Sequence, residues 1–339
     1  MKKLVRAMIQ QLEQGHNVVL CSIVGSFGST PRGAGAKMAV MEDGSTVGTI
    51  GGGAVEYHAE LLSKEIHQTR QSQTKSFQLT KNDVADIGMI CGGGVSVYFQ
   101  FLDAANADNL VMLRHILGLL TTNRNSWLIL TMADGEIWSM GTYDEENGLY
   151  GTTAITQEVL QPMLQPRAVY TPGETAYYVE PLVVAGTVYV FGGGHVAQEL
   201  VPAISHVGFR TVVFEERAEF CTPDRFPTAV DTVLGDFSNI YDKIRIEPHD
   251  YVIIMTRGHM ADRIILQQAL AAKPAYLGVI GSRKKIAETN RLMWEAGFTP
   301  EDTDRIYAPI GLEIGAETPA EIAISIAAEL IAVRAGLGK

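Results

Sequence analysis

Three consecutive glycines, Gly192 to Gly194, form the motif of this chain that is best suited to binding a ligand. They follow the apolar run 187–191 and precede a helix-like segment, which is the pattern of a strand, a phosphate-holding turn and a helix start. Gly192 would make the turn, Gly194 would let the backbone approach a ligand, and Ala197 would let the helix pack on the strand. Free N–H groups and the positive dipole end of a helix attract anions. We therefore predict a nucleotide or phosphate site at this turn.

Glu215 supports this prediction because it ends the next apolar run, about 20 residues after Gly194. A Rossmann unit places at this distance the carboxylate that grips a ribose hydroxyl, and a carboxylate there favours NAD over NADP. The alternative is a Rossmann-shaped unit whose pocket is empty or altered, and the sequence leaves it open.

Polar residues also follow the apolar run 250–255, namely Thr256, Arg257, His259 and Asp262. In parallel sheets, ligands bind beyond the carboxyl ends of the strands, so these residues should lie near the site. His259 and Asp262 are candidates for an acid–base or metal-contacting pair. The alternatives are a loop histidine that caps the next helix and a first-turn carboxylate that is favoured by the helix dipole.

Gly281, Ser282 and Arg283 follow a further apolar run, 275–280, and begin another helix-like segment. The guanidinium of Arg283 could hold a phosphate through paired N–H groups, as could those of the arginines at positions 217 and 257. These residues extend the predicted anion site along the same edge of the sheet.

The first half of the chain contains two further glycine triplets, 51–53 and 92–94, and Cys91 precedes the second. Backbone amides near Cys91 would lower the pKa of its thiol and favour the thiolate. The alternative is a small buried side chain, which is the usual state of a free cysteine. Glu56, in the first turn after the triplet 51–53, is either a ligand contact or a carboxylate that offsets the helix dipole.

Composition narrows the class of protein. The formal net charge of -11 argues against nonspecific binding to nucleic acid or to an acidic membrane. The three cysteines, Cys91, Cys21 and Cys221, have no metal-site spacing and cannot all pair, so we expect a reducing cytoplasm and a core position for Cys21. The first residues read as an amphipathic helix rather than a signal peptide. No apolar run reaches the ~18 residues that a membrane span needs.

The length of 339 residues indicates two domains, which we place at residues 1–185 and 186–339. In the second, apolar runs alternate with helix-like segments, which predicts a Rossmann-like, doubly wound parallel sheet. The first should be a mixed α+β domain. Its strands are expected at residues 18–24, 37–40, 46–50, 95–101, 127–132, 136–140 and 176–184, with a poor signal from 141 to 172. Thr318 and Glu321 predict a capping box at the start of the last helix.

These motifs together resemble the XdhC/CoxI family, whose members are accessory proteins of molybdenum hydroxylases such as xanthine dehydrogenase. The resemblance covers nearly the whole chain. It rests on residues 25–38, 48–56 and 88–93 of the first domain and on residues 191–197, 225–227, 276–283, 308–315 and 318–323 of the second.

The resemblance implies a small first domain joined to a Rossmann domain. It also implies a chaperone rather than an enzyme. Such a protein binds molybdenum cofactor, protects it while its terminal sulfur is installed, and delivers it to an apo-hydroxylase. The implied partners are a xanthine dehydrogenase-type apo-enzyme and a cysteine desulfurase, and a homodimer stays open.

Molybdenum cofactor is an anionic pterin phosphate with dithiolene sulfurs, so glycine turns suit its phosphate and a thiol suits its metal. We expect the cofactor between the two domains, with its phosphate near the turn 192–197 or Arg283 and its molybdenum toward Cys91. The residues that we assign to cofactor binding are Gly51, Gly52, Gly53, Cys91, Gly92, Gly93, Gly192, Gly193, Gly194, His195, Glu215, Thr256, His259, Gly281, Ser282 and Arg283.

The chain departs from the family pattern at two positions. Ala54 stands where members often have a cysteine after the first triplet, which argues against a mechanism with two thiols. Arg257 stands where the family often has a histidine, which leaves His259 without a paired histidine.

Two other functions compete with the chaperone. An NAD(P)-dependent oxidoreductase would use Glu215 to bind the ribose. Nucleotidyl transfer to the cofactor would need magnesium, for which Glu215, Asp236 and Asp262 are the available carboxylates.

Overall fold

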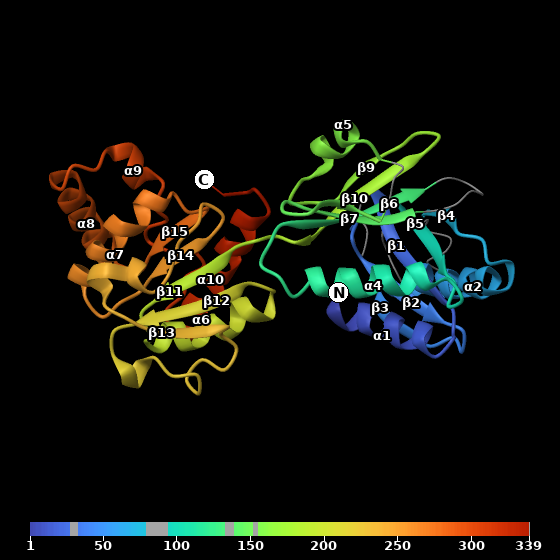
Figure 1. Ribbon diagram of the computed structural model, residues 1–339. Helices are drawn as coiled ribbons and strands as arrows, with labels where there is room; N and C mark the ends of the chain where they lie inside the picture. The colour runs from blue at the N-terminus through green and yellow to red at the C-terminus, as the bar shows by residue number, and fades with distance from the viewer. Residues whose placement is uncertain (28–32, 79–93, 133–138, 152–154, 339) are drawn as a thin grey trace. The chain divides into compact units, whose positions relative to one another are not determined.

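The computed structural model describes residues 1–27, 33–78, 94–132, 139–151 and 155–338. The chain divides into two compact units, Met1–Val184 and Ala185–Lys339, and each is described here by itself (Figure 1). Within the described ranges, no helix combines the length and the apolar character that crossing a membrane requires.

The second unit contains a five-stranded sheet whose neighbouring strands all run parallel. Its order is β13-β12-β11-β14-β15, so the chain starts in the middle, builds one edge and then returns to build the other. This is the order of a doubly wound nucleotide-binding sheet, and it confirms the predicted fold class. The strands are β11 (Thr187–Phe191), β12 (Arg210–Glu215), β13 (Asp231–Leu234), β14 (Tyr251–Ile254) and β15 (Tyr276–Val279).

Helices cover both faces of this sheet (Figure 1). Side chains alternate along β11, so Val188 and Val190 pack with α6 and α10, whereas Phe191 packs in the opposite layer with α7 and α8. Covering both faces explains why the inner strand β11 and its neighbour β14 are apolar along most of their length. The helices are α6 (His195–His206), η2 (Ala218–Phe220), η3 (Phe237–Asp242), α7 (His259–Ala272), α8 (Arg283–Glu295), α9 (Pro300–Asp304) and α10 (Pro319–Arg334).

The predicted capping box begins α10. The Thr318 hydroxyl accepts a 3.3 Å hydrogen bond from the Glu321 N–H, and the Glu321 carboxylate accepts one of 2.8 Å from the Thr318 N–H. Pro319 occupies the first helical position, where a missing N–H is harmless.

The first unit contains two five-stranded antiparallel sheets, with the orders β3-β2-β1-β5-β4 and β8-β7-β6-β10-β9. The first sheet consists of β1 (Val18–Phe27), β2 (Lys37–Met41), β3 (Thr46–Thr49), β4 (Gln73–Gln78) and β5 (Gly94–Leu102). The second consists of β6 (Ser126–Met132), β7 (Ser139–Asp144), β8 (Gly148–Tyr150), β9 (Val169–Thr171) and β10 (Ala176–Val183).

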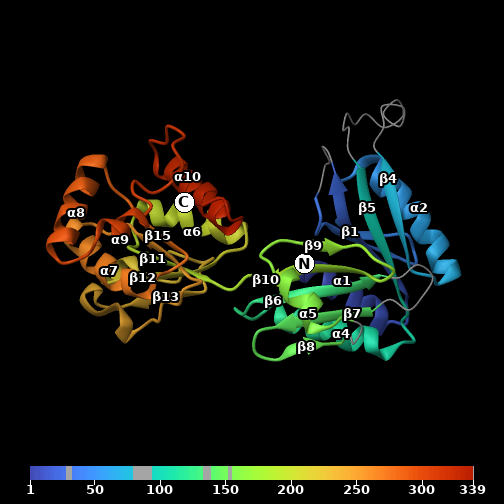
Figure 2. The same ribbon diagram turned by 90° about the horizontal axis from the view of Figure 1, so that it is seen from above.

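One apolar core joins the two sheets to helices α1 and α4 (Figure 2). Leu20 and Tyr98 of the first sheet and Leu130 and Tyr178 of the second all lie in it. The other face of the first sheet packs on α2, and that of the second packs on residues 155–164. The helices are α1 (Lys2–Glu13), α2 (Gly53–Thr69), α4 (Ala107–Leu119), α5 (Gln157–Leu160) and η1 (Gln161–Met163).

Two predicted strands of this unit are wrong in their extent. β1 continues past the predicted end at residue 24 to Phe27. The expected strand 136–140 begins outside the described residues, and β7 continues past its predicted end to Asp144. Gly141 does not end the strand because its backbone pairs with Ile129 of β6. The sequence also did not predict β4 or the short strands β8 and β9, which form by backbone pairing with their neighbours.

Candidate functional site

The turn after β11 leads from the sheet into α6 through three glycines with different surroundings. Gly192 has a φ of +109°, and a Cβ there would lie 2.6 Å from the Met255 oxygen, so the turn requires glycine. A Cβ on Gly193 would lie 2.2 Å from the Phe220 oxygen, so this glycine makes room for the chain itself. Around Gly194, apart from its chain neighbours and the backbone of α6, no heavy atom of the described residues lies within 4 Å of the Cβ position. Open space therefore adjoins the start of α6.

The start of α6 has the features expected of an anion site. Gly194 is the N-cap residue and makes no side-chain cap hydrogen bond, which leaves the first N–H groups of the helix to another partner. His195 follows with an exposed side chain. Ala197 is fully buried in the core with Val188 and Val190, so it holds the helix close to β11 as predicted.

Glu215 lies at the end of β12 and is only 1% exposed. Both oxygens of its carboxylate accept hydrogen bonds from donors of the chain itself. One oxygen, Oε2, accepts hydrogen bonds from Gly193 N at 2.8 Å and Arg217 Nη2 at 2.9 Å. The other, Oε1, accepts from Glu216 N at 3.0 Å, Arg217 N at 3.2 Å and Arg217 Nε at 3.0 Å. The predicted grip on a ribose hydroxyl is therefore not how Glu215 is used here, because its acceptor positions are occupied.

The pKa of Glu215 reflects this environment. Burial opposes ionisation, but the hydrogen bonds from the Arg217 side chain and from the backbone N–H groups of Gly193 and Arg217 outweigh it, and the pKa lies below its ordinary value. Glu215 is thus held as a carboxylate that ties the glycine turn to the end of β12.

The segment after β12 closes over the outside of the glycine turn. Arg225 donates hydrogen bonds to the Gly193 oxygen at 3.0 Å and to the Gln198 side chain at 2.9 Å. The guanidinium carbons of Arg217 and Arg225 lie 4.0 Å and 4.8 Å from the centroid of the Phe220 ring. These cation–π contacts hold the segment against the turn. Arg225 lies in one of the motifs that carried the resemblance, but its neighbours along the chain did not indicate this role.

The segments after β14 and β15 meet through an ion pair that the sequence did not predict, in which Asp262 is buried and Lys285 is partly exposed. Asp262 is 1% exposed, and Lys285 Nζ lies 2.7 Å from its Oδ2. Thr256 donates to Asp262 Oδ1 through its hydroxyl at 2.6 Å and its N–H at 3.1 Å. Lys285 also contacts the Ile280 oxygen at 3.5 Å. His259 begins α7, and its side chain lies outside the described part of the chain.

The predicted residues 281–283 begin α8. Ser282 is the N-cap residue and accepts a hydrogen bond from Lys285 N at 3.3 Å. Gly281 packs against the stem of Lys285, since a Cβ there would lie 3.1 Å from Lys285 Cδ. Arg283 is exposed and pairs with Glu313 at 3.1 Å, so its guanidinium is not directed at a buried site.

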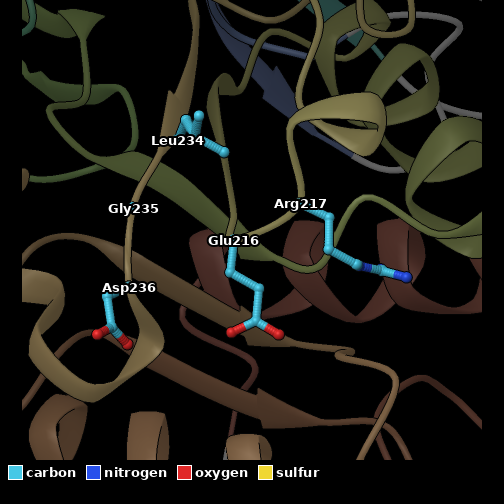
Figure 3. Close-up of a pocket in the computed structure, with 5 residues that line it drawn as sticks. All are labelled: Glu216, Arg217, Leu234, Gly235 and Asp236. Atoms are coloured by element: carbon cyan, nitrogen blue, oxygen red, sulfur yellow. The ribbon is translucent and has the colours of Figure 1, made fainter.

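Two grooves open at the carboxyl edge of the sheet. One of about 440 Å³ lies between the ends of β12 and β13 and is lined by Glu216, Arg217, Leu234, Gly235 and Asp236 (Figure 3). The other, of about 400 Å³, shares Glu216 and Arg217 and reaches the loop 256–258 and Met260 after β14. The grooves thus lie at the carboxyl ends of β12, β13 and β14, the edge where doubly wound sheets bind nucleotides.

The first unit has its own glycine turn. Gly51, Gly52 and Gly53 all have positive φ angles and lead into α2. Glu56 Oε1 accepts hydrogen bonds from Ile50 N at 2.9 Å, Gly51 N at 3.2 Å and Gly52 N at 2.9 Å. The carboxylate therefore occupies the position that an external anion would take at these three amides.

Cys91, the thiol that we predicted as a metal contact, lies outside the described residues, as do Gly92 and Gly93. Cys21 is fully buried as expected, and burial raises the pKa of its thiol to about 12. Among the His, Cys, Asp and Glu residues in the described ranges, no three gather as a set of metal ligands.

Comparison with known proteins gives matches along the whole chain. The model of the XdhC and CoxI family matches residues 11–78, and that of the XdhC Rossmann domain matches residues 188–330. Together they cover more than half of the chain.

The similar proteins include two with descriptive names. The chain is 25% identical, over 95% of both chains, to a Bacillus subtilis protein that is named as a probable subunit of xanthine dehydrogenase. It is 23% identical to "molybdenum cofactor insertion chaperone PaoD" of Escherichia coli over 98% of this chain and 88% of that protein. Escherichia coli YqeB is 27% identical over 95% of this chain, which spans 44% of the length of YqeB.

A solved structure agrees with these matches. A crystal structure described as a xanthine dehydrogenase from Bacillus halodurans superposes with a TM-score of 0.79 at 25% sequence identity, covering 98% of this chain and 96% of that one. With the two matching family models and the doubly wound sheet, this likeness completes the assignment: the chain belongs to the XdhC and CoxI family.

Proposed function

We propose that this protein is an accessory factor in the maturation of molybdenum enzymes. It binds molybdenum cofactor, protects the cofactor while its terminal sulfur is installed, and delivers it to a xanthine dehydrogenase-type apo-enzyme. A cysteine desulfurase is the proposed source of the sulfur. The similarity to a protein named as a molybdenum cofactor insertion chaperone supports this proposal.

The observation that carries the proposal is the open start of α6. Gly194 has open space on its Cα, and the first N–H groups of the helix have no side-chain cap. The cofactor carries a terminal phosphate, and phosphate is the group that a helix start of this kind binds.

The two glycine turns are not equivalent in this proposal. In the first unit, Glu56 already occupies the amides of residues 50–52, so Gly51, Gly52 and Gly53 are better suited to shaping the turn than to holding phosphate. At the turn after β11, Glu215 takes only the Gly193 amide of the three glycines. We therefore assign the phosphate to the amides after Gly194.

Cys91 remains the proposed contact to the molybdenum end. A thiolate is a soft ligand that suits this metal, and glycines directly follow Cys91 in the sequence. If Cys91→Ala retained and protected the cofactor as the wild-type protein does, this assignment would be wrong. Cys221→Ala is a matched control because Cys221 is a partly exposed free cysteine of the second unit.

The test of the proposed function is retention and transfer of the cofactor. The full chain is purified from a host that makes the cofactor, and its molybdenum and its oxidised pterin are quantified. It is then mixed with a molybdenum-free xanthine dehydrogenase-type apo-enzyme, and the activity gained is measured. We expect near-stoichiometric pterin and a gain of activity that follows transfer. Protein without pterin, together with an unchanged apo-enzyme, would refute the proposal.

NAD(P)-dependent oxidoreduction is the second candidate because the strand order is that of dinucleotide-binding domains. The carboxylate of Glu215 already accepts hydrogen bonds from Gly193 and Arg217, which argues against the usual contact with ribose. Hydride transfer between NAD(P) and any substrate of the purified protein would establish this candidate instead.

A further inference from the structure

The groove between the ends of β12 and β13 has both apolar and acidic side chains in its lining. These side chains play no part in the phosphate site proposed at the turn after β11. Leu234 is 50% exposed and offers an apolar wall, while Glu216 and Asp236 contribute carboxylates from adjacent strand ends. In Figure 3, both carboxylates point to the same side of the groove, and Arg217 points away from them. One end of the groove is thus acidic and the other is basic.

Gly235 lies at the floor of this groove because packing excludes a side chain there. A Cβ on Gly235 would lie 2.4 Å from the Phe214 ring. The Asp236 carboxylate accepts a 2.7 Å hydrogen bond from Ser238 N, which lowers its pKa and keeps it ionised. These local contacts hold the backbone and Asp236 in position before any ligand arrives.

Glu216 is the carboxylate at this edge that is available for a ligand. Glu215 is buried, and five hydrogen bonds from the chain end on its two oxygens. Glu216 follows it directly, is exposed, and lines both grooves. Among the residues that the structure describes, none donates a hydrogen bond to the Glu216 carboxylate. A pair of vicinal hydroxyl groups would supply the donors that a carboxylate accepts.

The second groove supplies room for a flat ring beside Glu216. Met260 is 64% exposed at its rim, whereas Phe237, which also lines it, is only 4% exposed and belongs to the core. The thioether of Met260 can make favourable contacts to a planar heterocycle. Arg217 lines both grooves and donates a hydrogen bond to Glu215, which also accepts one from Gly193 of the glycine turn. Arg217 therefore marks the end of the grooves that is nearest to the turn. The phosphate would therefore lie toward the turn, the ribose at Glu216, and the base in the second groove beside Met260.

We propose that these joined grooves form a ribonucleoside subsite in which Glu216, rather than Glu215, binds the ribose diol. The inference rests on the proposed function insofar as the nucleoside belongs to the cargo, namely to a form of the cofactor that carries a nucleotide. The same chemistry could be supplied by NAD(P), and the experiment separates the two sources.

The test measures binding to the full-length protein by isothermal titration calorimetry. The probes are CMP, AMP, NAD, 2′,3′-dideoxy-CMP, nucleotide-free molybdopterin and the nucleotide-bearing cofactor. The variant is Glu216→Gln, which removes the charge and keeps the shape. Glu219→Gln is the matched control, since Glu219 is also exposed and also interacts electrostatically with Arg217 but does not line either groove.

We expect Glu216→Gln to weaken binding of at least one ribonucleotide probe about tenfold, which corresponds to the loss of one charged hydrogen-bonding partner. The dideoxy probe should bind the wild type and Glu216→Gln equally, and Glu219→Gln should behave as the wild type. If the affected probe is the nucleotide-bearing cofactor, the nucleoside belongs to the cargo; if it is NAD alone, it belongs to a dinucleotide. The inference is overturned if every ribonucleotide binds Glu216→Gln as tightly as the wild type, or if none binds the wild type at about 1 mM.

The nucleotide-free molybdopterin arm separates this inference from the proposed function. Binding of molybdopterin by the wild type without binding of any nucleotide would overturn the nucleoside subsite and leave the proposed function standing. Binding of nucleotides that depends on Glu216, without binding of either form of the cofactor, would support the subsite and refute the proposed function.

Discussion

The backbone N–H of Gly193 donates a 2.8 Å hydrogen bond to the Glu215 carboxylate, which joins the glycine turn after β11 to the end of β12. Glu56 does the same for the turn before α2, where it accepts from the amides of residues 50–52. In both units, a carboxylate of the chain satisfies amides that glycine-rich turns elsewhere offer to phosphate. The open anion position of the second unit therefore lies one residue further along, at Gly194.

Gly193 and Gly194 are predicted to tolerate alanine very differently. Gly193→Ala places a Cβ 2.2 Å from the Phe220 oxygen, so the segment after β12 must move. We expect a loss of about 1–3 kcal/mol in the free energy of unfolding, the usual effect of overpacking. Gly194→Ala meets open space with a φ of -74°, so its stability should change by less than about 0.5 kcal/mol. Differential scanning calorimetry of both variants checks this, and equal melting temperatures would contradict it.

The stability contributed by Glu215 should depend on pH. Its pKa is lower in the folded protein than in the unfolded chain, so its contribution is complete above the unfolded value, near 4.5, and is lost as the pH falls through the folded value. We expect Glu215→Gln to be destabilised by about 2 kcal/mol near neutral pH, because the Arg217 guanidinium and the Gly193 N–H lose a charged acceptor.

The difference between wild type and Glu215→Gln should shrink as the pH falls below about 4.5, where the unfolded chain takes up a proton at Glu215, and should vanish once the folded carboxylate is protonated as well. Thermal melts at several pH values measure this. Glu219→Gln is the control, because Glu219 is exposed and should show no such convergence. A gap that stays constant down to acid denaturation would show that the charge of Glu215 is not what matters.

A buried ion pair joins the two sheets of the first unit. Lys37 and Glu180 pair between β2 and β10 with 3% and 6% of their side chains exposed, and Tyr178 donates a 2.7 Å hydrogen bond to Glu180. Lys37→Met leaves the Glu180 charge buried without its cation, so we expect a loss of about 3–5 kcal/mol. The double variant Lys37→Met/Glu180→Met removes both charges and should be more stable than Lys37→Met alone. Additive losses in calorimetry would contradict this coupling.

Lys285 is predicted to contribute to cofactor affinity. Two of the three N–H groups of its ammonium are accounted for by Asp262 and the Ile280 oxygen, which leaves one for an anionic ligand at the carboxyl edge of the sheet. Lys285→Gln should weaken cofactor binding about tenfold. Lys284→Gln, on the exposed neighbour, should not. Equal affinities in a titration of the two variants would assign Lys285 a purely structural role.

Local pattern predicted the parts of the site that depend on backbone conformation. Gly192 was expected to form the turn because glycine alone adopts its conformation at low cost, and Ala197 was expected to pack on the strand; the structure shows both. The alternation of apolar runs and helices likewise predicted the parallel sheet.

The partners of charged side chains could not be predicted, because they are distant along the chain. Glu215 has the sequence spacing of a residue that binds ribose. Only the fold shows that its carboxylate instead accepts hydrogen bonds from Gly193 and Arg217. Lys285, in the first turn of α8, forms an ion pair with Asp262, in the first turn of α7. The spacing of these residues in the sequence does not indicate that contact. Arg283 has the residue type of a phosphate ligand, but its side chain pairs with Glu313 at the surface.

The most direct test of the account is titration of the full-length protein with released molybdenum cofactor, for the wild type and for Gly194→Ala, under conditions where both melt at the same temperature. We predict saturable one-to-one binding with a dissociation constant of about 1 μM or tighter, weakened about tenfold by the added methyl group beside the helix start. Absence of saturable binding to the wild type, or equal affinity for both proteins, would contradict a phosphate site at the start of α6.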